Sequence, residues 1–395
     1  MPTPSNIRLA RRAVSGVFFV NGAVLGGWVP HIADVKHGLN LENHVLGLAL
    51  LASAIGAVSA MQFGGYLIQR LSSRRTLLLA GSGLVVMVPL LVAAPSLTLF
   101  VLTLFGYGAM NGLMDLSMNA HAMAVQEQFD RPIVSAVHGW FCVGGFAGAL
   151  GASMSGRLNA PPLYHLLLAS AVLGCLLHLT RRYLLPASAD QAAEHTPYAF
   201  PFKGPHGGQL LILGMMVAIS FMTEGALWDW LSLYLRVNLH ATASVGAAGF
   251  GFASVMMALG RFLGDSLVHR WGDAWVIGVS SVMAVIGYIA MVLAPNVPLA
   301  VVSAGVAGLG LANLVPILFR AAGSMRGLAA GIGLAGVATC GYGGFLFGPP
   351  LVGFIADARN LSFALGCMGA LIGVVAIWGP KSVSPGPGKS SSFSR

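Results

Sequence analysis

Charged side chains are scarce in this 395-residue chain: Asp, Glu, Lys and Arg make up 8% of it, against 56% hydrophobic residues. A soluble globular chain carries about 25% charged residues. The 21 basic and 12 acidic side chains cannot cover a chain of this length with a water-compatible surface. The composition therefore excludes a water-soluble fold and predicts a protein embedded in lipid.

Cysteine and long polar segments are also rare. The four cysteines, Cys142, Cys175, Cys340 and Cys367, lie within apolar runs, and no disulfide framework or metal motif is readable. No paired nucleophile and base is readable either, and the one long polar stretch, residues 184–207, is too short to hydrolyse a nucleotide. We therefore expect no enzyme, no cofactor and no metal.

The long apolar runs that remain predict helices. A backbone in lipid must form helices or a closed barrel, and runs such as 77–94 and 275–294 lack the alternation of barrel strands. Each span needs about 20 residues. We predict an all-α polytopic membrane protein with twelve transmembrane helices, at residues 12–33, 44–69, 75–94, 97–124, 132–157, 162–183, 208–236, 243–268, 274–294, 297–319, 327–356 and 361–379.

The polar stretch divides the chain into two halves that resemble each other. Residues 64–70 and 264–270 share Gly, Leu and Arg at an offset of 200, and Asn21-Gly-Ala corresponds to Glu224-Gly-Ala at an offset of 203. Parallel repeats of this kind are related by an axis along the membrane normal. We predict pseudo-symmetric six-helix bundles at 1–183 and 208–380, a cytoplasmic linker at 184–207 and a disordered tail at 381–395.

The net charge of +9 predicts an orientation. Sixteen of the 21 Lys and Arg residues fall on one side of the twelve predicted spans, four fall on the other side, and Arg261 lies within a span. Cytoplasmic loops carry the excess of basic residues. We therefore predict a multi-pass protein of a bacterial inner (plasma) membrane with both termini in the cytoplasm. The charge indicates orientation rather than a nucleic-acid partner.

Ionisable residues inside the spans are the strongest functional signal. Each costs at least about 2.5–3.5 kcal/mol unless it is paired, hydrated or neutralised. Asn111, Asp115 and Asn119 are spaced four apart, so they share one helical face. This face is either a polar seam between helices or a solute and proton site; we favour the site, because a carboxylate is a costly way to join helices.

Span 7 carries two further carboxylates. Glu224 lies well inside the span, where a desolvated carboxyl group can exchange a proton near neutral pH. Asp229 is nearer the outer end, where a solvated carboxylate is ordinary, so both interpretations stay open for it. In span 8, Arg261 and Asp265 are one turn apart, and we expect an ion pair between them or with a neighbouring helix.

Other side chains complete the predicted cavity. Asn21, Asn111 and Asn119 would hydrogen-bond a polar solute, and Trp28 or Trp228 would offer an apolar or stacking surface. His138, which opens span 5, and Tyr342 in span 11 either face the cavity or belong to packing and hinge elements. The glycines of span 5 and the sequence Gly348-Pro349-Pro350 predict close helix packing and a bend.

The chain resembles the major facilitator superfamily over nearly its whole length. The family's loop motif is G-x-x-x-D-R-x-G-R-R; Gly65, Arg70 and Arg74 match it, and Gln69 stands at the aspartate. Ser72 and Ser73 replace its Gly and Arg. The second copy, Gly-Arg-x-x-Gly-Asp through Gly272, matches better. The resemblance implies a cytoplasmic gate made by the following residues: Arg70, Arg261, Asp265 and Arg270.

Within that superfamily the chain is most similar to the YbjJ-type group and more distantly to fucose permease, through Asn21 to Pro30, the Asp115 region and the Glu224 region. We therefore predict a monomeric, proton-coupled symporter that moves a small solute, such as a sugar or another polar metabolite, by alternating access. One alternative is proton-driven efflux of drugs or other amphipathic compounds, favoured by 17 Met and 20 Phe. Another is a non-transporting receptor or scaffold.

Overall fold

The computed structural model describes residues 4–129, 133–186, 206–325, 328 and 330–383. These residues form fourteen α-helices and one 3₁₀ helix, and no strand occurs among them. The N-terminal half contains α1 (Pro4–Trp28), η1 (Val29–His31), α2 (Ile32–Gly38), α3 (Asn43–Leu71), α4 (Ser73–Ala93), α5 (Leu97–Gln126), α6 (Val134–Arg157) and α7 (Pro162–Thr180). The C-terminal half contains α8 (Gly207–Asn238), α9 (Ala243–Trp271), α10 (Asp273–Val292), α11 (Val297–Leu311), α12 (Leu314–Gly323), α13 (Ala330–Ala358) and α14 (Leu361–Val383).

Eleven helical stretches of the described chain are long and apolar enough to cross a membrane. In two of them neighbouring helices combine, Ile7–Gly38 and Val297–Gly323. The remaining expected span is α6, which is 24 residues long. The twelve predicted spans are thus all helical in the structure, with ends that move by a few residues. The predicted linker and tail fall mainly on 187–205 and 384–395, which lie outside the described residues.

Two of the predicted spans are interrupted, in each case near a proline. The first helix begins at Pro4 and passes through a 3₁₀ turn that contains Pro30 before it continues as α2. The tenth span breaks between α11 and α12, because Pro316 has no N–H to donate to the carbonyl of Ala312 four residues earlier. In α13, by contrast, the helix continues through Pro349 and Pro350.

Side chains cap several helices where short loops turn back into the bundle. Each capping oxygen accepts a hydrogen bond from a backbone N–H in the first turn, which would otherwise lack a partner. These caps are Ser72 on α4, Ser96 on α5, Thr242 on α9 and Asn296 on α11. Side-chain caps therefore help to fix where these four helices begin.

The two halves repeat each other in register. Helices α3 and α9 are both 29 residues long and are offset by 200 residues. The residues that follow them have nearly the same backbone conformation: φ is 82° at Ser72 and 80° at Gly272. The internal repeat that the sequence predicts is thus present in the fold.

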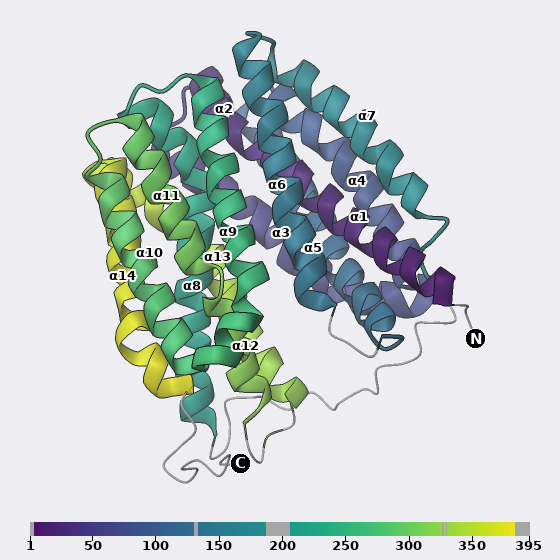
Figure 1. Cartoon of the computed structure of the whole chain (residues 1–395). Coiled ribbons are helices and arrows are strands. Elements are labelled where there is room, and N and C mark those ends of the chain that lie inside the picture. Colours follow the sequence, from purple (N-terminus) through teal and green to yellow (C-terminus); the bar gives the residue numbers. More distant parts are fainter. Residues whose placement is uncertain (1–3, 130–132, 187–205, 326–327, 329, 384–395) are drawn as a thin grey trace.

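Figure 1 shows the halves side by side, purple through blue to teal for the N-terminal half and teal through green to yellow for the C-terminal half. They meet mainly through two pairs of helices, α6 with α9 and α3 with α13. The ribbons are close together where α2 lies and diverge toward α12 (Figure 1). We call these two ends of the molecule the α2 end and the α12 end.

Glycines allow the helices within a half to approach closely. A Cβ atom on Gly22 of α1 would overlap the carbonyl oxygen of Phe141 of α6, and one on Gly144 of α6 would overlap the carbonyl oxygen of Phe19. The sequence prediction that the glycine-rich span 5 packs closely on another helix is therefore confirmed. This contact fixes α6 against α1 and so positions its other face toward the C-terminal half.

Candidate functional site

A central cavity of about 300 Å³ lies between the two halves. Its wall is formed by residues of α1, α3, α5, α6, α8 and α13, so both halves contribute. Most of the wall is apolar, and the polar side chains on it are few. These polar and aromatic lining residues are Asn21, Trp28, Ser53, Tyr107, Asn111, Asp115, Phe141, Glu224, Trp228, Asp229, Tyr342 and Phe345.

The polar residues of the N-terminal half come from α1 and α5. Asn21 donates through Nδ2 to Oδ1 of Asn111 at 3.0 Å, which joins the two helices. Two turns further along α5, Asn119 donates through Nδ2 to the Asp115 carboxylate at 3.2 Å and to the Asp115 carbonyl at 2.8 Å. Asn21, Asn111 and Asp115 line the cavity, while Asn119 lies behind Asp115 and orients it.

The C-terminal half contributes a buried ion pair. Arg261 of α9 binds Oε1 of Glu224 of α8 at 2.8 Å, and Trp228 donates through Nε1 to the same oxygen at 3.3 Å. The second guanidinium nitrogen of Arg261 lies 3.4 Å from Sγ of Cys142 on α6, in the other half. Of the two pairings considered for Arg261, the structure shows the one with a neighbouring helix rather than the one with Asp265.

Asp229 differs from the other carboxylates of the cavity. It lines the cavity next to Trp228, and it has neither a hydrogen bond nor an ion pair with any residue that the structure describes. Asp229 is therefore a half-buried carboxylate that faces the cavity without a counter-charge.

Eight of the ten side chains predicted for the cavity line it, and sequence reasoning missed several other lining residues. His138 is not on the wall: its ring packs edge-on against Phe18 with centroids 4.9 Å apart. The missed lining residues include Phe141, Phe345 and Tyr107. Tyr107 could have been found, since it precedes Asn111 by four residues on the same face of α5. The two phenylalanines carry no such signal.

The gate residues assigned by resemblance lie at the α12 end, except Arg261. Arg70 stacks on Tyr66 at 5.1 Å, and Arg270 stacks on Trp271 at 5.3 Å, each within its own half. Asp265 is 3.8 Å from Arg320, which also contacts Asp273 at 3.2 Å. These contacts therefore do not join the halves.

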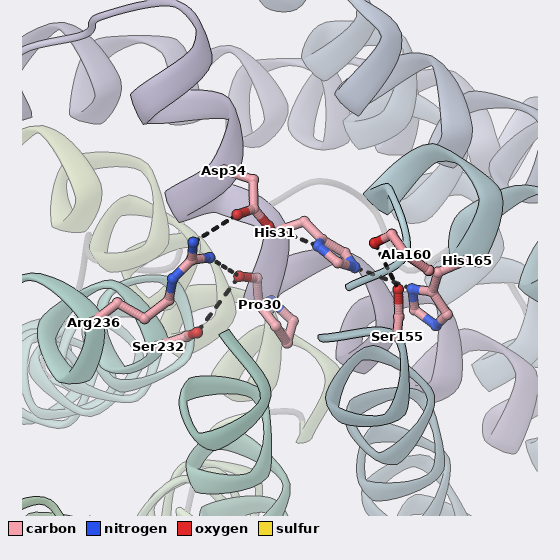
Figure 2. A network of polar contacts seen from close by, with 8 residues as sticks. All are labelled: Pro30, His31, Asp34, Ser155, Ala160, His165, Ser232 and Arg236. Atoms are coloured by element: carbon pink, nitrogen blue, oxygen red, sulfur yellow. Dashed lines mark hydrogen bonds and ion pairs between the residues drawn. The ribbon is translucent and has the colours of Figure 1, made fainter. Parts of the chain in front are cut away.

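The α2 end is closed by polar contacts between the halves, shown in Figure 2. Arg236 of α8 binds the Asp34 carboxylate at 2.6 Å and the Pro30 carbonyl at 3.5 Å. On its other side, Asp34 accepts from His31 at 2.9 Å, and His31 lies 3.0 Å from a nitrogen of His165 on α7. The network thus ties the end of α8 to α2 and, through His31, to α7.

A second link at the α2 end joins α13 to α3. The Asp357 carboxylate accepts hydrogen bonds from the backbone N–H groups of Asn43 (3.1 Å) and His44 (2.6 Å) at the start of α3, whose own N-cap residue, Glu42, makes no side-chain cap. Possible metal-ligand atoms of Glu42, His44 and Asp357 lie within 4.8 Å of one another. The bonds of Asp357 to the start of α3 account for this cluster as a helix cap supplied by the opposite half.

Comparison with known proteins adds three relatives, although no family model matches the chain. It is 32% identical over 359 residues to an uncharacterized MFS-type transporter of Yersinia pestis, covering 91% of this chain and 92% of the relative. Membrane protein MosC of Rhizobium meliloti is 33% identical over 364 residues, which cover 91% and 86%. An uncharacterized transporter, y4wD, of Sinorhizobium fredii is 30% identical over 371 residues, which cover 92% and 97%.

Solved structures show the same fold at low sequence identity. A mutant of the nucleoside transporter NupG superimposes with a TM-score of 0.79 at 12% identity, over 95% of this chain and 99% of NupG. A mutant of the fucose:proton symporter FucP of E. coli gives 0.60 at 14% identity, over 95% and 98%. The narrower similarity to the YbjJ-type group stays a prediction. On this fold and these relatives, the chain belongs to the major facilitator superfamily of membrane transporters.

Proposed function

We propose that the protein is a secondary active transporter that moves a small polar solute together with protons through the central cavity, by alternating access. The observation that carries this proposal is the cavity itself, built from both halves and lined by Asn21, Asn111, Asp115 and Glu224. A site shared between two rigid bundles can be exposed to either side when the bundles rock against each other. The solute class we propose is a sugar or another small polar metabolite.

The contacts between the halves support alternating access. Cross-half hydrogen bonds and ion pairs gather at the α2 end, at Asp34–Arg236 and at Asp357 with the start of α3. The halves diverge at the α12 end (Figure 1). The structure therefore corresponds to a state closed at the α2 end, and breaking these contacts would be required to open that end.

We propose that the α12 end faces the cytoplasm of a bacterial inner membrane. Basic residues cluster at the helix ends there, among them Arg70, Arg74, Arg270 and Arg320, as the positive-inside rule requires. The α2 end, which is closed in this state, would then face the periplasm. The cavity is complete within one chain, which supports function as a monomer.

Proton coupling is assigned to Asp115 and Glu224. A proton on Glu224 would remove the charge that holds Arg261, and Arg261 also contacts Cys142 in the other half, so its release would alter a contact between the bundles. Asp115 faces the cavity with Asn119 as its hydrogen-bond donor. A proton on either carboxylate thus changes the charge at a point where helices of the transport path meet.

The test uses purified protein in liposomes and a solute chosen by thermal-shift screening of sugars, sugar acids, amino acids and drugs. We expect Asp115→Asn and Glu224→Gln to abolish accumulation driven by a pH gradient while solute counterflow, which needs no net proton movement, persists. Glu127→Gln, which changes an exposed carboxylate outside the cavity, serves as the matched control. Undiminished gradient-driven accumulation in both cavity variants would contradict proton coupling through these residues.

Efflux of an amphipathic compound is the second candidate, favoured by the largely apolar wall, which includes Leu25, Leu50, Val58, Met61 and Leu104. Deleting the gene distinguishes the two. Loss of growth on one carbon source indicates import of a polar metabolite, and increased drug sensitivity indicates export.

A further inference from the structure

The charges of the central cavity are unbalanced. Three carboxylates line it, Asp115, Glu224 and Asp229, and no Lys, Arg or His is among the described residues that line it. The nearest guanidinium, Arg261, is already bound to Glu224 at 2.8 Å. Asp115 and Asp229 therefore lie on the wall of the cavity without a cationic partner, one in each half.

The carboxylates of this cavity offer only hydrogen-bond acceptors, whereas Asn111, Tyr107 and Tyr342 on the same wall carry amide or hydroxyl donors. Asn21 and Asn111 hydrogen-bond each other, so their amides are at least partly engaged. Asp115 accepts from Asn119, and Asp229 accepts from no described residue. An ionised carboxylate can only accept hydrogen bonds, and an ammonium group can only donate them. A ligand that complements these oxygens must therefore bring donors, and a positive charge on those donors strengthens each bond.

The aromatic wall fits the same kind of ligand. Trp28, Trp228, Phe141 and Phe345 line the cavity around the carboxylates. The face of an aromatic ring attracts a cation within about 6 Å of its centroid, most strongly for Trp. An anionic solute would meet repulsion from two unpaired carboxylates. A neutral solute would leave Asp229 without a partner, and unpaired buried charges are costly.

We propose that the transported solute carries a protonated amine, whose ammonium group binds Asp229 on the C-terminal half of the cavity with Asp115 facing it from the N-terminal half. This assignment rests on the transport function proposed above and narrows its solute to a small polar cation, such as an amino sugar or another hydroxylated amine. Asp229 becomes the residue that selects for charge, while Asn21 and Asn111 contact the polar remainder of the solute.

The test compares matched probes that differ only in charge. The full-length protein in detergent is titrated with glucosamine, glucose and glucuronate, and with tyramine, tyrosol and 4-hydroxyphenylacetate, and the thermal unfolding midpoint is followed. We expect at least one amine to raise the midpoint while its neutral and acidic counterparts do not. Asp229→Asn should weaken the binding of that amine at least tenfold, and Glu127→Gln should leave its binding unchanged.

The outcomes separate this inference from the transport proposal. If a neutral or acidic probe binds as well as its amine, if no probe of either set binds, or if Asp229→Asn binds the amine as tightly as the native protein, the charge assignment is wrong. Flux of a neutral sugar through proteoliposomes without flux of any amine would overturn the inference and leave the transport function standing. Amine binding that depends on Asp229, without flux of that amine, would support the binding role of Asp229 and contradict the claim that this amine is transported.

Discussion

At the residue scale, the distinctive group beside the cavity is Arg261. It is the cation that binds Glu224, and it also reaches Cys142 on α6 of the other half. Removing one partner of a buried ion pair is far more costly than replacing both, because the remaining charge stays desolvated. The contact therefore links the electrostatics of the cavity to the interface between the halves.

We expect Arg261→Met to lower the free energy of unfolding by about 3 kcal/mol, because it leaves Glu224 as a buried carboxylate without a counter-charge. The double variant E224Q/R261M should recover most of this loss, since neither charge remains. Thermal unfolding of the two single variants and the double variant in one detergent measures the coupling. If the double variant is as unstable as R261M, the ion pair is not what stabilises this region.

Sequence reasoning at this scale succeeds where the information is local to one helix. The four-residue spacing of Asn111, Asp115 and Asn119 places them on one face of α5, and the structure shows two of them lining the cavity with the third hydrogen-bonded to Asp115. The partner of Arg261 could not be chosen in this way. Asp265 is one turn away on the same helix, whereas Glu224 is 37 residues earlier and meets it through packing of α8 on α9.

At the element scale, the turn between α3 and α4 carries backbone strain. Ser72 has φ 82° and ψ 155°, a region that is essentially restricted to glycine, and its repeat counterpart Gly272 has φ 80° and ψ 161°. The family motif also has glycine at the position of Ser72. The same backbone conformation thus explains why the family motif and the second repeat both have glycine at this position. Ser72 is the position where this chain lacks that glycine.

Ser72→Gly should stabilise the protein by about 1 kcal/mol, because the strain disappears while the weak cap at 3.5 Å to the N–H of Arg75 costs only a few tenths to lose. The reciprocal change Gly272→Ser should destabilise it by a similar amount. Denaturation midpoints of the two variants measure both effects. A fall in the midpoint of S72G would show that the hydroxyl matters more than the backbone.

The helices also show which features of the fold the sequence predicts and which it does not. Twelve apolar runs predict the helical spans well, because lipid leaves the backbone no other partners. The break at Ala312 and Asn313 was not predicted although Pro316 was visible, whereas α13 continues as a helix through Pro349 and Pro350, where the sequence predicts a bend. A proline removes one donor, and whether the helix then breaks depends on neighbouring packing, such as the approach of Gly264 to Asn313.

At the scale of the whole molecule, the repeat places opposite charges across the interface between the halves. Asp34 and Arg236 are 202 residues apart, within the offset range of the repeat, and so are Pro30 and Ser232, which hydrogen-bond each other. Equivalent positions of the two halves therefore form an ion pair at the α2 end, with the acid from the N-terminal half and the base from the C-terminal half. With Asp357 at the start of α3, these contacts hold the α2 end closed.

Alternating access is the central claim, and distances between spin labels test it most directly. In a background without the four native cysteines, one label pair is placed at Leu158 and Leu293 at the α2 end, and another at Tyr183 and Trp271 at the α12 end, all exposed positions. The double variant D34N/D357N removes the charged links that close the α2 end. We predict that it shifts the α2-end pair to longer distances and the α12-end pair to shorter ones; distances that stay unchanged, or that change in the same direction at both ends, would contradict the account.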